Sequence, residues 1–190
     1  MQLRTDRVGV LVDQLDTSVE MARERFVGLT DDEYLWEPAP AALSIRRPED
    51  VRVSGALGHG DWLLEWPRPE PDPPPLRTIA WLVGHLYDQF NGRYEWTFGS
   101  RQGDVRTMST FLPSADQALT RLWAVVGQWR DGLDSLSDHQ LDMIGYGQFP
   151  AGLDPQIPII AIAWWVNREL IHHTAEIALL RDLYASSERA

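Results

Sequence analysis

The sequence contains no cysteine, and this absence excludes disulfide bonds, cysteine-ligated zinc, iron–sulfur clusters and a cysteine nucleophile. It also lacks a long apolar run, because the longest, IPIIAIAWWV, has about ten residues where a membrane-spanning helix needs about 20. The N-terminal residues MQLRTDRVGVLVDQLDTSVE carry charges throughout and include no apolar core of signal-peptide length. These absences predict a protein of the reducing cytoplasm that has no membrane partner.

Positive charge is scarce. Lys and Arg number 17 against 28 Asp and Glu, which gives a formal net charge of −11. A protein that binds the phosphate backbone of a nucleic acid needs a basic face, so nucleic acid is not an expected partner. The familiar phosphate-loop, dinucleotide, nucleophile-elbow and HExxH zinc motifs are also missing. The length of 190 residues and the hydrophobic content of 44% suit one globular domain spanning residues 1–190.

Four long segments have the apolar spacing of amphipathic helices, at residues 6–27, 78–98, 113–133 and 158–185. Asp6 and Thr78 are placed to cap the first two, and Ser114 with Gln117 forms a capping box for the third. A four-helix bundle is the simplest way to bury four such stripes. The predicted fold class is therefore all-α, a four-helix bundle with long connections.

The connection over residues 30–77 is the longest, and it should pack on the bundle rather than join two domains. Thr30 and Glu33 form a second capping box, which predicts a short helix there. The run RVSGALGHGDW suits a strand or hairpin, and six prolines from Pro67 to Pro75 favour an extended polyproline strap. If the tryptophans of this strap are exposed, they favour a homodimer.

The last helical segment carries the first candidate ligands. A 100° step per residue places His173 near the centre of its apolar stripe and Glu169 one turn earlier on the flank of that stripe. Such a pair can share a metal ion, or the histidine can simply bond to the carboxylate without one. A rival pair, His172 and Glu176, is rotated by about 100° toward the side of the helix.

The second long helix offers a third ligand, His85. It shares a mixed polar and apolar stripe with Thr78, Trp81, Gln89, Gly92 and Trp96, which suits a cavity wall with Trp81 and Trp96 as its sides. His85, Glu169 and His173 would form a set of two histidines and one carboxylate with one position open. That is the arrangement of catalytic zinc, and it also holds iron, nickel or manganese. The loop histidines, His59 and His139, are expected to be solvated.

The sequence resembles the DinB-like metal-binding four-helix bundles, and within them the actinobacterial members and the mycothiol-dependent maleylpyruvate isomerase branch. The resemblance lies in WLVGHL, in NRELIHHTAEIALLRDLY, and in the LTDDEYLWEP turn and WPRPEPDPPP strap. It implies that His85, Glu169 and His173 are the metal ligands. It also implies a metal at one end of the bundle interior and an association with low-molecular-weight thiols.

These observations predict an enzyme that uses a divalent metal, most simply zinc, to activate a small cosubstrate. A thiol is favoured, in a transfer or isomerisation reaction, and because the chain has no cysteine the sulfur must come from that cosubstrate. The alternatives are a metal-dependent hydrolase, with Asp88 or Glu176 as general base, and a non-catalytic metal-binding or sensor module. Asp88 could instead orient a metal ligand. Three arginines could bind a substrate carboxylate, although surface ion pairs are the favoured interpretation for each of them: Arg93, Arg168 and Arg181.

Overall fold

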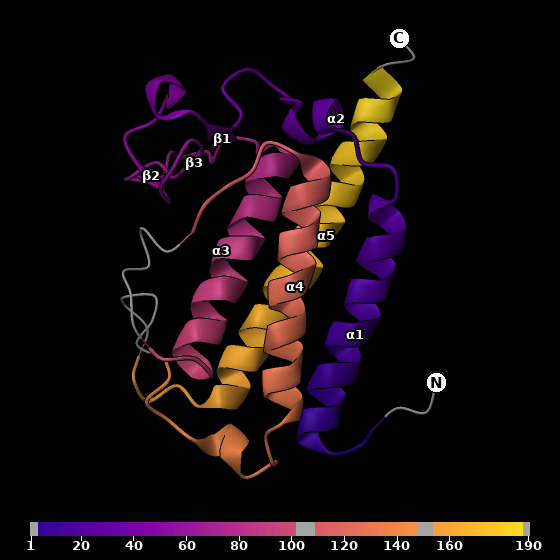
Figure 1. The fold of residues 1–190 in the computed structure, drawn as a ribbon, viewed down its shortest axis with the longest axis vertical. Coiled ribbons are helices and arrows are strands. Elements are labelled where there is room, and N and C mark those ends of the chain that lie inside the picture. Colours follow the sequence, from indigo (N-terminus) through magenta and orange to yellow (C-terminus); the bar gives the residue numbers. More distant parts are fainter. Residues whose placement is uncertain (1–3, 102–108, 148–153, 188–190) are drawn as a thin grey trace.

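A computed structural model describes residues 4–101, 109–147 and 154–187. Four long helices form the bundle that the sequence predicts: α1 (Arg7–Phe26), α3 (Ile79–Thr97), α4 (Ala115–Asp134) and α5 (Ile159–Ser187). α1 packs against α4 and α5, and α3 packs against the same two helices, so the four surround one core (Figure 1). The mostly helical fold class is confirmed, and each of the four helices begins and ends within two residues of its predicted bounds.

The helices begin where side chains satisfy the free backbone amides of the first turn. The Asp6 carboxylate accepts a hydrogen bond from the amide of Gly9 at 3.0 Å, and the Thr78 hydroxyl accepts one from Trp81 at 3.1 Å. Thr30 likewise caps the short helix α2 (Asp31–Leu35), as predicted. The capping box predicted at Ser114 is wrong, because the Ser114 side chain makes no capping hydrogen bond.

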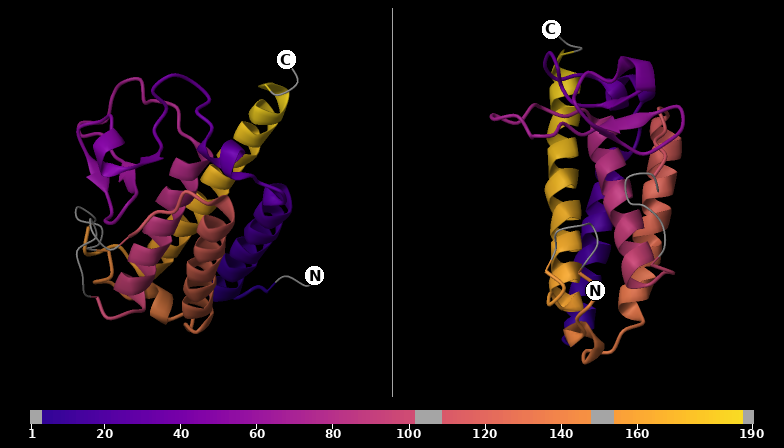
Figure 2. Two further views of the ribbon diagram at one scale, coloured as in Figure 1. Left: turned by 45° about the horizontal axis from the view of Figure 1, so that its top comes forward. Right: turned by 90° about the vertical axis from the view of Figure 1, so that its left-hand side faces the viewer.

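Residues 36–77 form a small sheet and loops that cross one end of the bundle (Figures 1 and 2). The strands are β1 (Ile45–Arg46), β2 (Ala56–Leu57) and β3 (Leu63–Glu65), in the order β1-β3-β2, and both pairings are antiparallel. Short 3-10 helices lie at Pro48–Asp50 and Gln140–Asp142. The sheet adds a small β element to the predicted all-α fold. Of its strands, only β2 falls within the run for which a strand or hairpin was predicted.

This connecting segment is fastened to the bundle by its apolar side chains. Leu64 is completely buried, and the ring of Trp66 stacks on that of Trp81 with 5.5 Å between centroids. The indole nitrogen of Trp81 donates to the carbonyl of Glu65 at 2.7 Å, which fixes the ring of Trp81 against the sheet. The Pro-rich residues 67–75 have no regular secondary structure, and they bend at residues 68–69 and 72–73.

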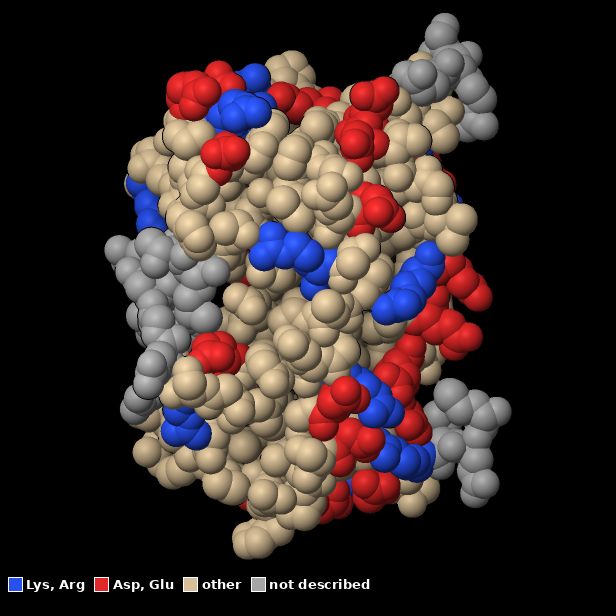
Figure 3. All heavy atoms as spheres, in the orientation of Figure 1, with Lys and Arg blue, Asp and Glu red and all other residues tan. Residues whose placement is uncertain are grey.

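The face seen in Figure 3 has no broad basic area. Acidic and basic side chains intermix over the lower ends of α1 and α4, where Arg130 bonds to Asp16 and Asp134. Within the part of the chain that the structure describes, no helix combines the length and the apolar character needed to cross a membrane.

Candidate metal centre

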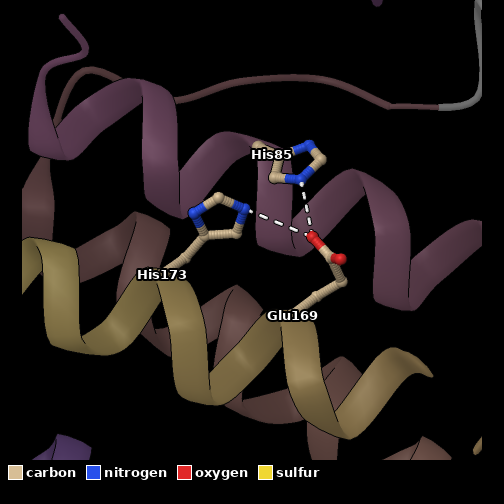
Figure 4. Close-up of side chains that lie close together, drawn as sticks. All are labelled: His85, Glu169 and His173. Atoms are coloured by element: carbon tan, nitrogen blue, oxygen red, sulfur yellow. Dashed lines mark ion pairs between the residues drawn. The ribbon is translucent and has the colours of Figure 1, made fainter. Parts of the chain in front are cut away.

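Three predicted ligands meet between α3 and α5. His85 projects from α3, Glu169 and His173 project from α5, and both imidazoles point at the same carboxylate oxygen (Figure 4). The Nε2 atom of His85 lies 3.8 Å from Oε2 of Glu169, and Nε2 of His173 lies 3.3 Å from the same oxygen. The sequence-predicted set is thus brought together in space.

The spacing of these donors fits a metal ion. One ligand atom from each of the three residues lies within 4.8 Å of the other two. Ligand atoms about 2.0–2.2 Å from a tetrahedral ion lie about 3.3–3.6 Å apart, so the measured distances need only small side-chain adjustments. Neutral imidazole nitrogen and carboxylate oxygen are ligands that zinc, iron, nickel and manganese accept.

Burial and hydrogen bonding set the charges of the three groups. The pKa of Glu169 lies well below its usual range because His173 and His85 bond to the carboxylate. Burial lowers the pKa of His173, but its bonds to Glu169 and Glu176 outweigh this effect and raise the pKa above its ordinary value. Burial lowers the pKa of His85. The surroundings therefore favour an ionised Glu169 and a neutral His85, and they favour the protonated form of His173, with which a metal ion would compete.

Two further side chains hold the ligands from behind. Oε2 of Glu176 lies 3.1 Å from Nδ1 of His173, so a proton on Nδ1 leaves Nε2 facing Glu169. Arg168 donates to Oε1 of Glu169, the oxygen that does not face the histidines. The predicted rival pair is therefore divided, because Glu176 bonds to His173 while His172 is exposed.

A second group of possible ligands shares His173 with the first. It comprises His172, His173 and Glu176, all on α5. The first group differs in two respects that favour it: it joins two helices, and both of its histidines line a cavity whereas His172 does not. The two loop histidines, His59 and His139, are exposed, as predicted.

A cavity of about 210 Å³ lies directly over His85 and His173. Its wall comes from the bundle and from the connecting segment, and comprises Leu43, Trp66, Pro67, Glu70, Arg77, Trp81, His85 and His173. The prediction that Trp81 walls a cavity is confirmed. Trp96, Thr78, Gln89 and Gly92 do not line it, since the connecting segment supplies the opposite wall instead. Trp66, Glu70 and Arg77 were missed, because no periodic pattern connects this segment with the helices.

The other residues considered from sequence have structural partners. Arg181 bonds to the buried Glu33 at 2.8 Å, and Arg93 is fully buried with its guanidinium over the ring of Trp165. Asp88 accepts a hydrogen bond from Ser109 at 2.5 Å, and no described hydrogen bond joins it to His85. None of these arginines or Asp88 lines the cavity over the histidines.

Comparison with known proteins supports one assignment, that of the family to which the chain belongs. The pattern that defines the DinB superfamily matches residues 14–177, which is most of the chain. No curated protein and no solved structure matches the sequence.

Proposed function

This chain belongs to the DinB superfamily, and from that premise we propose that it binds a divalent metal ion through His85, Glu169 and His173 and exposes it to a small cosubstrate. The observation that carries the proposal is the convergence of three donors from two helices, of which the two histidines line an open cavity. A structural site is closed by four protein ligands, whereas three ligands beside a cavity leave a position for another molecule. Zinc suits this donor set best, and nickel, iron or manganese are the alternatives.

The protein side of this chemistry is visible in the contacts around the ligands. A bound divalent ion would lower the pKa of a water or thiol that coordinates it, which supplies a nucleophile at neutral pH. The Glu176 carboxylate favours a proton on Nδ1 of His173, which would leave Nε2 to bind the ion. Arg168 holds the outer oxygen of Glu169. Trp66 and Trp81 exclude water from one wall of the cavity.

A low-molecular-weight thiol is the proposed cosubstrate, in a transfer or isomerisation reaction. The absence of cysteine supports it, because a sulfur nucleophile must then come from outside the chain. The resemblance to the mycothiol-dependent branch of the family points to the same class. A hydrolase would need a free general base beside the ion. Glu176 already bonds to His173, and Asp88 bonds to Ser109 away from the cavity.

Calorimetric titration of metal-free protein with zinc tests the metal centre. We expect one site per chain, which His173→Ala abolishes or weakens by at least about 100-fold because one of three ligands is lost. His172→Ala is the matched control, since it removes the neighbouring exposed histidine and should leave zinc affinity within about twofold. If His172→Ala destroys binding, the second group is the metal site; if His173→Ala retains full binding, the proposed centre is wrong.

The zinc-bound protein is then titrated with mycothiol, bacillithiol and glutathione. Binding of at least one of them, lost in Glu169→Ala, is the expected result. If none binds while the ion is held by four protein ligands, the site is structural and the proposed cosubstrate is refuted.

A further inference from the structure

The cavity over the candidate ligands contains a cation, Arg77, that the metal centre itself does not use. Its backbone position is fixed, because Leu43 and Arg77 form an isolated parallel bridge. The amide of Leu43 donates to the carbonyl of Leu76 at 2.8 Å, and the amide of Thr78 donates to the carbonyl of Leu43 at 2.9 Å. Its guanidinium lies 4.8 Å from the ring centroid of Trp81 and lines the cavity. Arg77 is therefore held at the wall as a preorganised positive group.

The guanidinium of Arg77 is incompletely satisfied. Its Nη2 atom lies 3.6 Å from Glu70 and its Nη1 atom lies 4.0 Å from Glu176, so both carboxylates neutralise its charge from beyond hydrogen-bond distance. Its Nε atom is buried and has no hydrogen-bond partner among the described residues. A buried donor without a partner is unfavourable, so an acceptor that reached this fork would be bound well.

Of the two carboxylates near Arg77, that of Glu70 can move away from the guanidinium easily. Glu176 is committed to His173 at 3.1 Å, whereas the Glu70 side chain is 68% exposed and belongs to the irregular Pro-rich residues 67–75. An exposed ion pair of this length contributes little to stability. Glu70 thus shows that a carboxylate can approach Arg77 in this cavity, although Glu70 itself stays too far away to form a hydrogen bond with it.

We propose that Arg77 binds the carboxylate of the molecule that enters the cavity, and that this carboxylate takes the place of Glu70. The fork of an arginine matches a carboxylate with two parallel hydrogen bonds, which the long contact to Glu70 does not supply. The rest of the molecule lies along the wall formed by Trp66 and Trp81, so it is apolar or aromatic. This inference rests on the proposed function for the role of the cavity, and it specifies the substrate class as a small apolar or aromatic carboxylate.

The volume and the shape of the cavity agree with a small ligand. The volume of about 210 Å³ is below the roughly 300–1,000 Å³ that is usual for drug-sized ligands. Both tryptophans are fixed before binding, Trp81 by its hydrogen bond to Glu65 and Trp66 by stacking on Trp81. Little side-chain freedom is therefore lost when a ligand binds against them.

Titration of metal-free protein, kept in EDTA, with benzoate and with its neutral analogue benzamide tests the inference without any contribution from a metal. We expect benzoate to bind at least about 10-fold more tightly than benzamide, because only benzoate pairs with Arg77. Arg77→Gln should remove this preference and Arg77→Lys should keep part of it. Glu70→Gln should strengthen benzoate binding by severalfold, because it removes the competing carboxylate.

Two control variants lie on the same connecting segment. Arg47→Gln removes an arginine that stacks on Trp62 at 5.2 Å, and Glu49→Gln removes an exposed carboxylate. Neither residue lines the cavity, and both variants should behave as wild type.

Three results would overturn the inference: equal binding of benzoate and benzamide, a preference for benzoate that survives Arg77→Gln, or weaker benzoate binding by Glu70→Gln. The zinc titration is read separately. Zinc binding without a benzoate preference refutes the inference alone, and a benzoate preference without zinc binding refutes the proposed function.

Discussion

At the scale of single residues, the buried carboxylates differ in how many donors surround them. Glu65 is almost fully buried and accepts hydrogen bonds from the amides of Ser44 and Arg52 and from the Arg46 side chain. Asp88 is largely buried too, but among the described residues Ser109 is the one donor that opposes the effect of burial on its charge. Burial therefore raises the pKa of Asp88 to about 6, and the ionised carboxylate is costly there.

Replacing Asp88 with Asn should stabilise the protein at alkaline pH. The pKa of Asp88 is about 6 in the folded chain and near its ordinary value when unfolded, so the folded state holds a proton that the unfolded state releases. Stability is thus lost as pH rises through this window, and the loss is complete above it. We expect Asp88→Asn to raise the free energy of unfolding at pH 8 by on the order of 2–3 kcal/mol and to leave it unchanged at pH 4.

Urea unfolding at pH 4, 6 and 8 measures the effect of Asp88→Asn. Asp61→Asn, which neutralises an exposed aspartate, is the control and should change stability by less than about 0.5 kcal/mol at every pH. A gain for Asp88→Asn that is equal at pH 4 and pH 8 would show that packing, rather than ionisation, causes it.

Single-residue predictions succeeded where one helix decides them. The 100° step separates His173 from His172, and α5 indeed buries the first and exposes the second. The 100° helical step could not place Arg77, because the position of Arg77 depends on its bridge to Leu43, which lies far away in the sequence. The partner of Glu176 was also misassigned, since both histidines are within one turn of it and only packing selects His173.

At the scale of elements, α4 shows how a helix start depends on another helix. The local sequence predicts a capping box at Ser114, yet the free amide of Ala115 donates to Asp31 of α2 at 2.7 Å. A cap supplied from so far along the sequence has no local signature. It joins the first turns of α2 and α4, so the short helix positions the long one.

Substitution of Asp31 should therefore destabilise α4 although it lies outside that helix. We expect Asp31→Ala to lower the free energy of unfolding by about 1 kcal/mol, the usual cost of a lost cap, and Ser114→Ala to have almost no effect. For a chain of this length, 1 kcal/mol corresponds to a Tm decrease of about 2–4 °C, which calorimetry resolves. If Ser114→Ala lowers the free energy of unfolding more than Asp31→Ala does, the helix is capped locally by Ser114 and the prediction is wrong.

The sheet is the element that the sequence predicted least well. Its strands have two or three residues each, too few for an alternating apolar pattern to appear. Tertiary contacts form them instead: Leu64 is buried, and the Glu65 carboxylate accepts hydrogen bonds from three donors. Long helices leave many turns of pattern in a sequence, and strands this short leave none.

At the scale of the whole molecule, the candidate site lies where the bundle meets the connecting segment. α3 and α5 supply the donors (Figure 4), and residues 43–77 supply most of the residues that line the cavity. The donor set could be predicted because it lies on two regular helices. The wall could not, because it depends on how an irregular segment packs. This division predicts that metal affinity and ligand specificity can be altered separately.

Removal of the metal should lower stability without unfolding the protein, since in its absence His173 remains held between Glu169 and Glu176. Free zinc at 100 times its Kd stabilises the folded state by about 2.7 kcal/mol, which corresponds to a Tm difference of about 5–10 °C between zinc and EDTA.

This Tm difference should depend on pH, because zinc competes with a proton for His173, whose pKa is raised. In the metal-free protein that pairing stabilises the fold at low pH and is lost as pH rises through the raised pKa, whereas zinc binding strengthens over the same range. Thermal unfolding at pH 6, 7 and 8 should therefore show a Tm difference that widens with pH in the wild type and vanishes in His173→Ala; a difference independent of pH would exclude His173 as a ligand.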